Sequence, residues 1–297
     1  MSYTPPADAD FRDSLIQSGD TAHARLRRIF GQAFTPMALE NMTRMLTKYS
    51  DKLVQQLRAA AEKNPVQDMS AWYNFTTFDL NGEFALGEAF HCLDRGGNSH
   101  FFLDIVLGGV VIGCQVWQLQ RYGLLTLIEP FLPKSVMEKQ YQMAKYVKSL
   151  VDQRMRHGFI PGHADVLNYL LENRRPEDEL LPGEIYDNAL TLVVAGSETT
   201  ATLLAVVTSL LCKHPDVLAR VQDEVRLPFK SNEEITLSAV NDLTHMLAVL
   251  SEALRVFPPS AFGFPRIIAT KGGQTVAGYW VPEGVCCGRR SAEHCMA

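Results

Sequence analysis

The stretch from Glu184 to Lys213, EIYDNALTLVVAGSETTATLLAVVTSLLCK, has helical periodicity and is the longest apolar helix that the sequence predicts. His214-Pro215 follows it directly and ends it. At its middle, AGSETT (Ala195–Thr200) places two small residues, a carboxylate and hydroxyls among apolar side chains. A glycine weakens a helix interior by about 1 kcal/mol relative to alanine, and a buried carboxylate needs a partner. The segment therefore predicts a groove for proton delivery, a packing notch between two helices, or a polar interruption in a membrane helix.

The sequence on either side of this stretch is helical almost throughout. Apolar spacing and helix-ending prolines predict further helices over Thr21–Phe34, Pro36–Lys63, Ser70–Leu86, Lys134–His157, Asp165–Glu172, residues 215–225 and Leu237–Phe257. From Ile267 the period changes to that of two short strands around Gly272-Gly273, a hairpin signal. Because strands and helices do not alternate, the expected fold is mainly α with a small β-sheet.

Composition excludes several classes of protein. The 297 residues are 46% hydrophobic and 21% charged, as in a folded globular chain, and the net charge of −5 gives no reason to expect nucleic acid as a partner. Six cysteines are too few for a disulfide scaffold. The first twenty residues have neither a basic nor an apolar segment, so we expect no signal peptide and no membrane anchor.

A membrane protein spanning at Ile105–Leu119 and Leu190–Leu211 is a weaker alternative. A membrane helix needs about 20 consecutive apolar residues, and the first of these spans is shorter. Glu198 lies in the middle of the second. For the dense apolar region Phe101–Ile128 we therefore favour a buried or substrate-channel helix.

Two further pairs of residues have helical spacing that suits a site. Glu252 and Arg255 are three residues apart and can pair, and their apolar neighbours predict that the pair is buried. His23 and Arg27 are four residues apart on one face, two donors suited to an anionic group. Taken alone, each pair is more often an exposed, solvated feature.

The order of these motifs resembles cytochrome P450 monooxygenases. AGSETT in a long helix is followed by HPDVLARVQDEV, then by SEALRVFPP and FPR, and HARLRRIFGQAF is similar to the family's early heme-contacting helix. YNFTTFDL, NEEIT and VAGYWVPEG look like microsomal P450s of fungal secondary metabolism, which hydroxylate terpenoids such as trichothecenes. The resemblance runs from about Gly19 to Gly284 and implies a P450-like helical domain with a small sheet.

The resemblance also implies a heme b cofactor and roles for residues of the central helix. Thr199 would hydrogen-bond dioxygen at the heme, Glu198 would relay protons, and Ala195 and Gly196 would make room for oxygen. Glu252 and Arg255 would form the structural pair that locks the heme-side core.

Further residues are assigned by the same resemblance. His23, Arg27 and Arg266 would bind the heme propionates, and a small lipophilic substrate would lie against Phe101–Leu125 and Ala261–Phe264. The electron donor would be NADPH-cytochrome P450 reductase. The family resides at the endoplasmic-reticulum membrane; without an anchor, this chain is expected to be cytoplasmic or peripheral.

The sequence departs from the family's pattern after Gly284. The family's iron ligand is a cysteine thiolate in a Gly-Arg-Cys-Gly loop downstream of the Glu-x-x-Arg helix, whereas this chain continues VCCGRRSAEHCMA. We therefore expect residues 1–284 to be a partial P450 domain, incomplete at both ends, and residues 285–297 to be an unrelated, unstructured tail. The spacing of the tail's metal-binding residue types argues against a zinc site at Cys286, Cys287, His294 and Cys295.

The sequence leaves two readings open. The first is a P450-type monooxygenase for a lipophilic terpenoid or polyketide, with this chain alone inactive because the axial cysteine is absent. The second is an inactive P450 remnant or a non-catalytic helical protein that keeps an apolar ligand pocket.

Overall fold

A computed structural model describes residues 14–16, 18–95, 134–172, 179–231, 234–260 and 266–287. The chain divides into two compact units, Met1–Ala201 and Thr202–Ala297, and the boundary falls within the long central helix. Each unit is described by itself.

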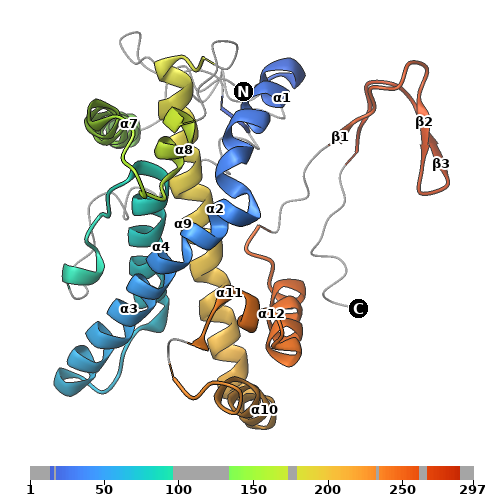
Figure 1. Cartoon of the computed structure of the whole chain (residues 1–297). Coiled ribbons are helices and arrows are strands. Elements are labelled where there is room, and N and C mark those ends of the chain that lie inside the picture. Colours follow the sequence, from blue (N-terminus) through green and yellow to red (C-terminus); the bar gives the residue numbers. More distant parts are fainter. Residues whose placement is uncertain are drawn as a thin grey trace. The chain divides into compact units, whose positions relative to one another are not determined.

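The first unit is a bundle of helices (Figure 1). In chain order its elements are α1 (Asp20–Phe30), η1 (Gly31–Phe34), α2 (Pro36–Asn41), α3 (Thr43–Lys63), α4 (Met69–Leu86), η2 (Leu93–Arg95), α7 (Lys134–His157), α8 (Val166–Glu172) and most of α9 (Pro182–Lys213). The prediction of a single helix over Pro36–Lys63 is wrong, because the chain turns at Met42 and α3 starts anew. The other predicted helices of this unit lie within a few residues of their expected bounds.

Side chains and glycine set the ends of α4. Asp68 caps its beginning by accepting a hydrogen bond from the Ala71 N–H at 3.2 Å. Gly87 ends the helix in the left-handed conformation, with φ of 74°. The Arg154 side chain packs against this glycine, so that a Cβ at residue 87 would lie 2.7 Å from Arg154 Cδ. Both conformation and packing therefore require glycine at this position.

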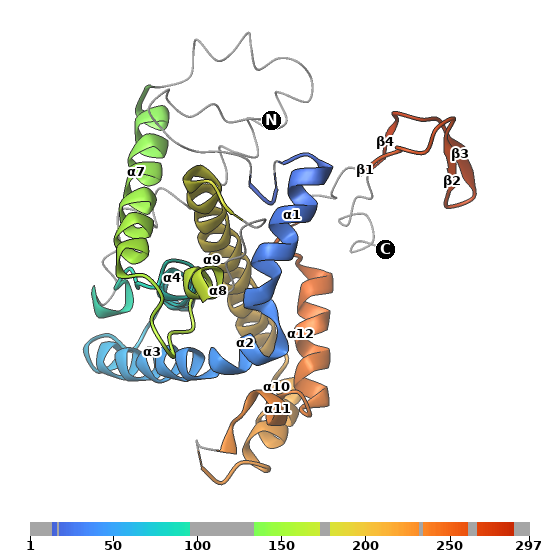
Figure 2. The ribbon, with the colours of Figure 1, turned by 45° about the horizontal axis from the view of Figure 1, so that its top comes forward.

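The core of the first unit is formed mainly by residues from α3, α4, α7, α8 and α9, helices that Figure 2 shows in a turned view. Its members include large side chains with almost no exposure: Tyr49, Phe78, Phe90, Val147, Val151, Leu167 and Val193. Fully burying one aliphatic or aromatic side chain contributes about 1.5–3 kcal/mol. This packing fixes the position of the N-terminal half of α9.

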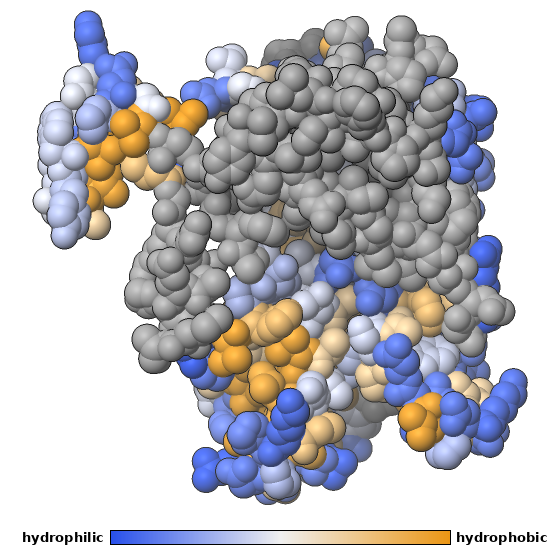
Figure 3. Space-filling model, turned by 180° about the vertical axis from the view of Figure 1, so that it is seen from behind, coloured by the Kyte–Doolittle hydropathy of each residue, from blue (hydrophilic) through white to orange (hydrophobic). Residues whose placement is uncertain are grey.

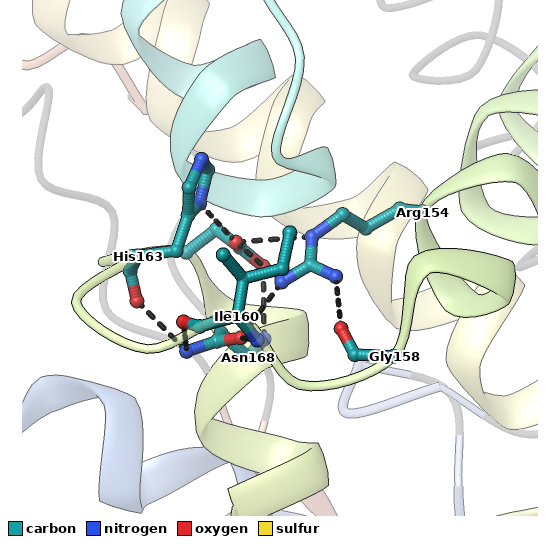
Figure 4. A network of polar contacts seen from close by, with 6 residues as sticks. Arg154, Gly158, Ile160, His163 and Asn168 are labelled. Atoms are coloured by element: carbon teal, nitrogen blue, oxygen red, sulfur yellow. Dashed lines mark hydrogen bonds and ion pairs between the residues drawn. The ribbon is translucent and has the colours of Figure 1, made fainter.

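A buried polar network joins α7 to α8 (Figure 4). Arg154 donates to Asp165 from Nε at 3.1 Å and from Nη2 at 2.9 Å, and its Nη1 donates to the Gly158 carbonyl at 2.7 Å. Asn168 accepts hydrogen bonds from Arg154 at 2.9 Å and from the Ile160 N–H at 2.8 Å. The network satisfies the polar groups of a tight connection that would otherwise be buried without partners.

The second unit begins within α9 and continues with α10 (Pro215–Arg226), α11 (Leu237–Val240) and α12 (Thr244–Val256). The prediction of one helix over Leu237–Phe257 is wrong, since residues 241–243 form a turn between α11 and α12. Glu224 of α10 accepts the backbone N–H groups of His245 at 2.9 Å and Met246 at 2.7 Å. These two donors belong to the first turn of α12, which needs acceptors from outside the helix.

Two antiparallel pairs of short strands complete the second unit: β1 (Arg266–Ile267) with β4 (Cys286–Cys287), and β2 (Gln274–Val276) with β3 (Tyr279–Val281). The hairpin turn is formed by Ala277 and Gly278, both with positive φ, so the prediction of a hairpin around Gly272-Gly273 is wrong. Those two glycines instead belong to a turn before β2, in which the Gly273 N–H donates to the Thr270 carbonyl at 2.9 Å. Gly273 is needed because a Cβ there would lie 2.6 Å from the Val281 carbonyl. The expected mainly α fold with a small sheet is confirmed.

The strands also correct the expectation for the tail. β4 lies within residues 285–297, which were expected to be unstructured, and Arg266 pairs with Cys287 in its ladder. Residues 288–297, including His294 and Cys295, are outside the described part of the chain.

Apolar side chains remain exposed on the second unit. Figure 3 shows apolar surface along the strand segment, where Ile267 is 69% exposed. On α12, Leu254 and Val256 are each 43% exposed.

In the described residues, α9 is long and apolar enough to cross a membrane by length and composition alone. Its first half, however, contributes Ile185, Ala189 and Val193 to the core of the first unit.

Candidate functional site

The centre of α9 places a hydroxyl and a small residue on one face. The Thr199 hydroxyl donates to the Ala195 carbonyl, four residues earlier, at 2.8 Å. Both residues are exposed within the described structure, and α9 remains helical through them. A hydroxyl in this position uses its proton on the helix and keeps its oxygen lone pairs for a donor from outside. The groove for proton delivery that the sequence predicts stays a prediction.

Glu198 is the half-buried acid next to Thr199. Its Oε2 atom is buried and has no hydrogen-bond partner among the described residues. Loss of solvation by burial raises the pKa of the Glu198 carboxyl above its ordinary value of 4.5. A carboxyl with a raised pKa holds a proton to higher pH, as a group that delivers protons must.

Gly196 and Ser197 face α4. A Cβ at residue 196 would lie 2.8 Å from Asn81 Cγ and closer still to Asn81 Oδ1. The buried Ser197 hydroxyl donates to the Val193 carbonyl at 2.6 Å and lies 3.5 Å from the Thr77 carbonyl of α4. This side of the AGSETT segment is therefore a packing notch between two helices. Of the alternatives that the sequence leaves open, the notch is found on the face toward α4, and the Thr199 hydroxyl lies exposed on another face.

His23 and Arg27 lie one turn apart on α1. His23 is half-buried and Arg27 is exposed, and neither side chain has a hydrogen bond or ion pair to another described residue. Two donors with this spacing can bind the carboxylate groups of a ligand.

The sequence interpretation missed the contacts that orient α1. Arg25, on another face of the helix, forms an ion pair with Glu184 and also donates to the Glu179 carbonyl at 3.2 Å. Glu184 uses its second oxygen to accept the Leu181 N–H at 2.9 Å, which caps the start of α9. The signal for the cap was present, because Glu184 is the third residue after Leu181. Its pairing with Arg25 is a tertiary contact 159 residues away in sequence.

Glu252 and Arg255 form the pair that the sequence predicts, in the second unit. Arg255 donates to the two carboxylate oxygens from Nε at 2.7 Å and from Nη2 at 2.6 Å, and this contact lowers the pKa of Glu252. The expectation that the pair is buried is wrong, since the two side chains are 57% and 58% exposed. The reason is that the apolar neighbours Leu254 and Phe257 are themselves exposed in this unit.

The joint arrangement of the remaining predicted site residues stays a prediction. Arg266 is exposed in β1 of the second unit, whereas His23 and Arg27 belong to the first unit, so their joint binding of a ligand stays a prediction. The expected substrate-contacting segments, Phe101–Leu125 and Ala261–Phe264, lie outside the described residues.

Comparisons with known proteins agree with the family resemblance of the sequence motifs. The family model for cytochrome P450 matches residues 7–288. Trichothecene C-4 hydroxylase from Trichoderma arundinaceum is 34% identical over 90% of this chain and 54% of its own length. Cytochrome P450 monooxygenase traB from Penicillium crustosum is 36% identical over 95% and 55%, and averantin hydroxylase from Dothistroma septosporum is 32% identical over 91% and 50%. The chain spans about half the length of these curated relatives.

Solved structures with a similar fold are P450 heme domains. The crystal structure of the cytochrome P450DA heme domain has a TM-score of 0.72 at 23% identity, over 92% of this chain and 58% of that one. A cytochrome P450 named CYP102L1 has a TM-score of 0.76 at 20% identity, over 94% and 63%. At these identities the likeness shows the fold.

Proposed function

The chain belongs to the cytochrome P450 family, and on that premise we propose that it contributes the oxygen-activating helix of a heme-thiolate monooxygenase. The proposed substrate is a lipophilic secondary metabolite, a terpenoid or a polyketide. The names of two fungal relatives, trichothecene C-4 hydroxylase and averantin hydroxylase, support hydroxylation as the reaction. NADPH-cytochrome P450 reductase as electron donor and the endoplasmic-reticulum membrane as location are parts of the same proposal.

Three residues of the first unit offer groups that suit a heme site. His23 and Arg27 present two donors on one face of α1, which suits the propionate carboxylates. Glu198 Oε2 is buried and has no partner among the described residues, so a bound ligand could supply its hydrogen-bond partner. Arg266 is proposed as a third propionate donor.

Heme, when bound, supplies the activation of dioxygen and the insertion of one oxygen atom into a C–H bond. The residues of α9 manage protons beside it. The raised pKa of Glu198 keeps a proton available in a half-buried position. The bond to the Ala195 carbonyl directs the Thr199 hydroxyl, so that its oxygen can accept a hydrogen bond from a proton donor at the site. The observation that carries the proposal is this hydroxyl beside an unpartnered buried carboxyl on one helix.

The assay for this role measures product formed per NADPH consumed. The native product of this gene, combined with NADPH-cytochrome P450 reductase, is offered sesquiterpenes and anthraquinone polyketides, and gain of one oxygen atom is detected by mass spectrometry. Thr199→Ala is expected to lower the product yield per NADPH. Thr208→Ala is the matched control, since Thr208 donates to the Leu204 carbonyl at 2.8 Å on the same helix. Equal yields in both variants, or no oxygenated product, contradict the proposal.

The propionate assignment has a separate test. His23→Ala combined with Arg27→Ala is expected to lower the heme retained after purification, measured from the ratio of heme to protein absorbance. Arg44→Ala, which removes an exposed arginine from α3, is the control for loss of surface charge. Unchanged heme content in the double variant counts against these two ligands.

A further inference from the structure

Asn81 occupies the space that a side chain at residue 196 would need. A Cβ on Gly196 would lie 2.8 Å from Asn81 Cγ and 3.2 Å from Asn81 Nδ2. Real Cβ atoms essentially never have neighbours closer than 3.0 Å. As long as Asn81 keeps this position, only glycine fits at residue 196, and the Asn81 side chain of α4 packs directly against the backbone of α9 there; both helices are labelled in Figures 1 and 2.

The Asn81 side chain is held from its own helix. Its Nδ2 donates to the Thr77 carbonyl at 2.8 Å, which directs the amide oxygen toward Gly196. The Ser197 hydroxyl of α9 lies 3.5 Å from the same carbonyl. The Thr77 carbonyl of α4 is therefore contacted both by the Asn81 side chain and by the Ser197 hydroxyl of α9.

The notch adjoins the residues of the Thr199–Ala195 hydrogen bond. Gly196 lies between Ala195, whose carbonyl accepts the Thr199 hydroxyl, and Ser197, which faces α4. We propose that Asn81 is a positioning residue: its amide fixes how closely α9 approaches α4 at Gly196, and so holds the Ala195 carbonyl and the Thr199 hydroxyl in place. The purpose of that placement rests on the proposed monooxygenase function, but the contact itself does not.

A double-mutant cycle between the two positions tests the contact. Replacing glycine by alanine inside a helix raises the folding equilibrium constant about two- to fivefold when nothing else changes. Gly196→Ala is therefore expected to lower the urea midpoint in the native background, where it meets Asn81, and to raise it in the Asn81→Ala background. Substitutions at two residues in contact are expected to have non-additive effects on stability. A change of the same sign and size in both backgrounds overturns the proposal.

Local hydrogen exchange distinguishes positioning from a general loss of stability. Asn81→Ala is expected to speed exchange of the amides from Ala195 to Thr200 more than exchange of the amides in α7. Asn74→Ala is the matched control, because Asn74 donates to the Ser70 carbonyl at 3.0 Å on the same helix. A uniform increase across the unit, or an equal effect of Asn74→Ala on residues 195–200, refutes a positioning role. Neither readout uses heme, so a failure here is separate from a failure of the proposed function.

Discussion

Asp165→Ala removes the carboxylate that neutralises Arg154 between α7 and α8. The Asp165 side chain is completely buried, and that of Arg154 is only 6% exposed. Arg154 donates two hydrogen bonds to this carboxylate, at 3.1 Å and 2.9 Å, and His163 Nδ1 lies 2.7 Å from it. Removing one partner of a buried ion pair leaves the other charge uncompensated and costs about 3–5 kcal/mol. Since a domain is stable by only about 5–15 kcal/mol, the loss is a large part of the total.

The assay is urea unfolding followed by far-ultraviolet circular dichroism, with the free energy of unfolding taken at constant m-value. Arg255→Ala is the control, because it breaks an ion pair of similar geometry that is more than half exposed and should change stability little. Combining Asp165→Ala with Arg154→Met removes the buried charge and should recover part of the loss. A loss below about 1 kcal/mol for Asp165→Ala, the range of exposed pairs, refutes this reasoning.

Three further predictions concern the core and the candidate site. Burial and the hydrogen bond to Glu83 raise the pKa of Tyr49 above its ordinary value of 10.0. Above pH 10 the unfolded chain therefore loses a proton that the folded chain keeps, and the free energy of unfolding should fall as the pH rises. Tyr49→Phe should make this fall smaller, measured as urea midpoints between neutral and alkaline pH. The pKa of Glu198 is also raised in the folded chain, so the free energy of unfolding should fall as the pH rises from 4.5. Glu198→Gln should therefore be more stable than the native protein at neutral pH, and equal urea midpoints for the two proteins would contradict this prediction. Gly87→Ala should cost more than about 1 kcal/mol in thermal unfolding and more than Gly158→Ala, because both glycines have positive φ but only residue 87 also meets Arg154.

Local signals in the sequence predicted most of the helices. The bounds of α7 were predicted to the residue, because its charged amphipathic pattern ends at Gly158. The predictions failed where a helix is interrupted without glycine or proline. The chain turns at Met42 and at residues 241–243, although the helical spacing of apolar residues continues across both turns. These turns depend on packing and capping, such as the Glu224 bonds to the start of α12, which involve residues about twenty positions apart.

The candidate site was predictable as a set of residues but not as an arrangement. AGSETT indicated an unusual segment, and its sequence left a groove and a notch open. Only the structure shows the notch on the face toward α4, because Asn81 has no sequence signal that links it to Gly196. The burial of Glu252 and Arg255 was inferred from apolar neighbours, yet in this unit those neighbours face outward. Local hydrophobicity gives the period of a helix, but the direction of its apolar face depends on what packs against it.

The central claim is that this chain serves a heme-thiolate monooxygenase, and its most direct test is spectroscopic. The reduced, carbon-monoxide-bound difference spectrum is measured on the protein as isolated from its native host. The account predicts a Soret band of thiolate-ligated heme in stoichiometric amount for the native product, and no thiolate band for residues 1–297 produced alone, which lack the family's Gly-Arg-Cys-Gly loop. Protein isolated folded but without heme, or with a spectrum of histidine-ligated heme, would contradict it.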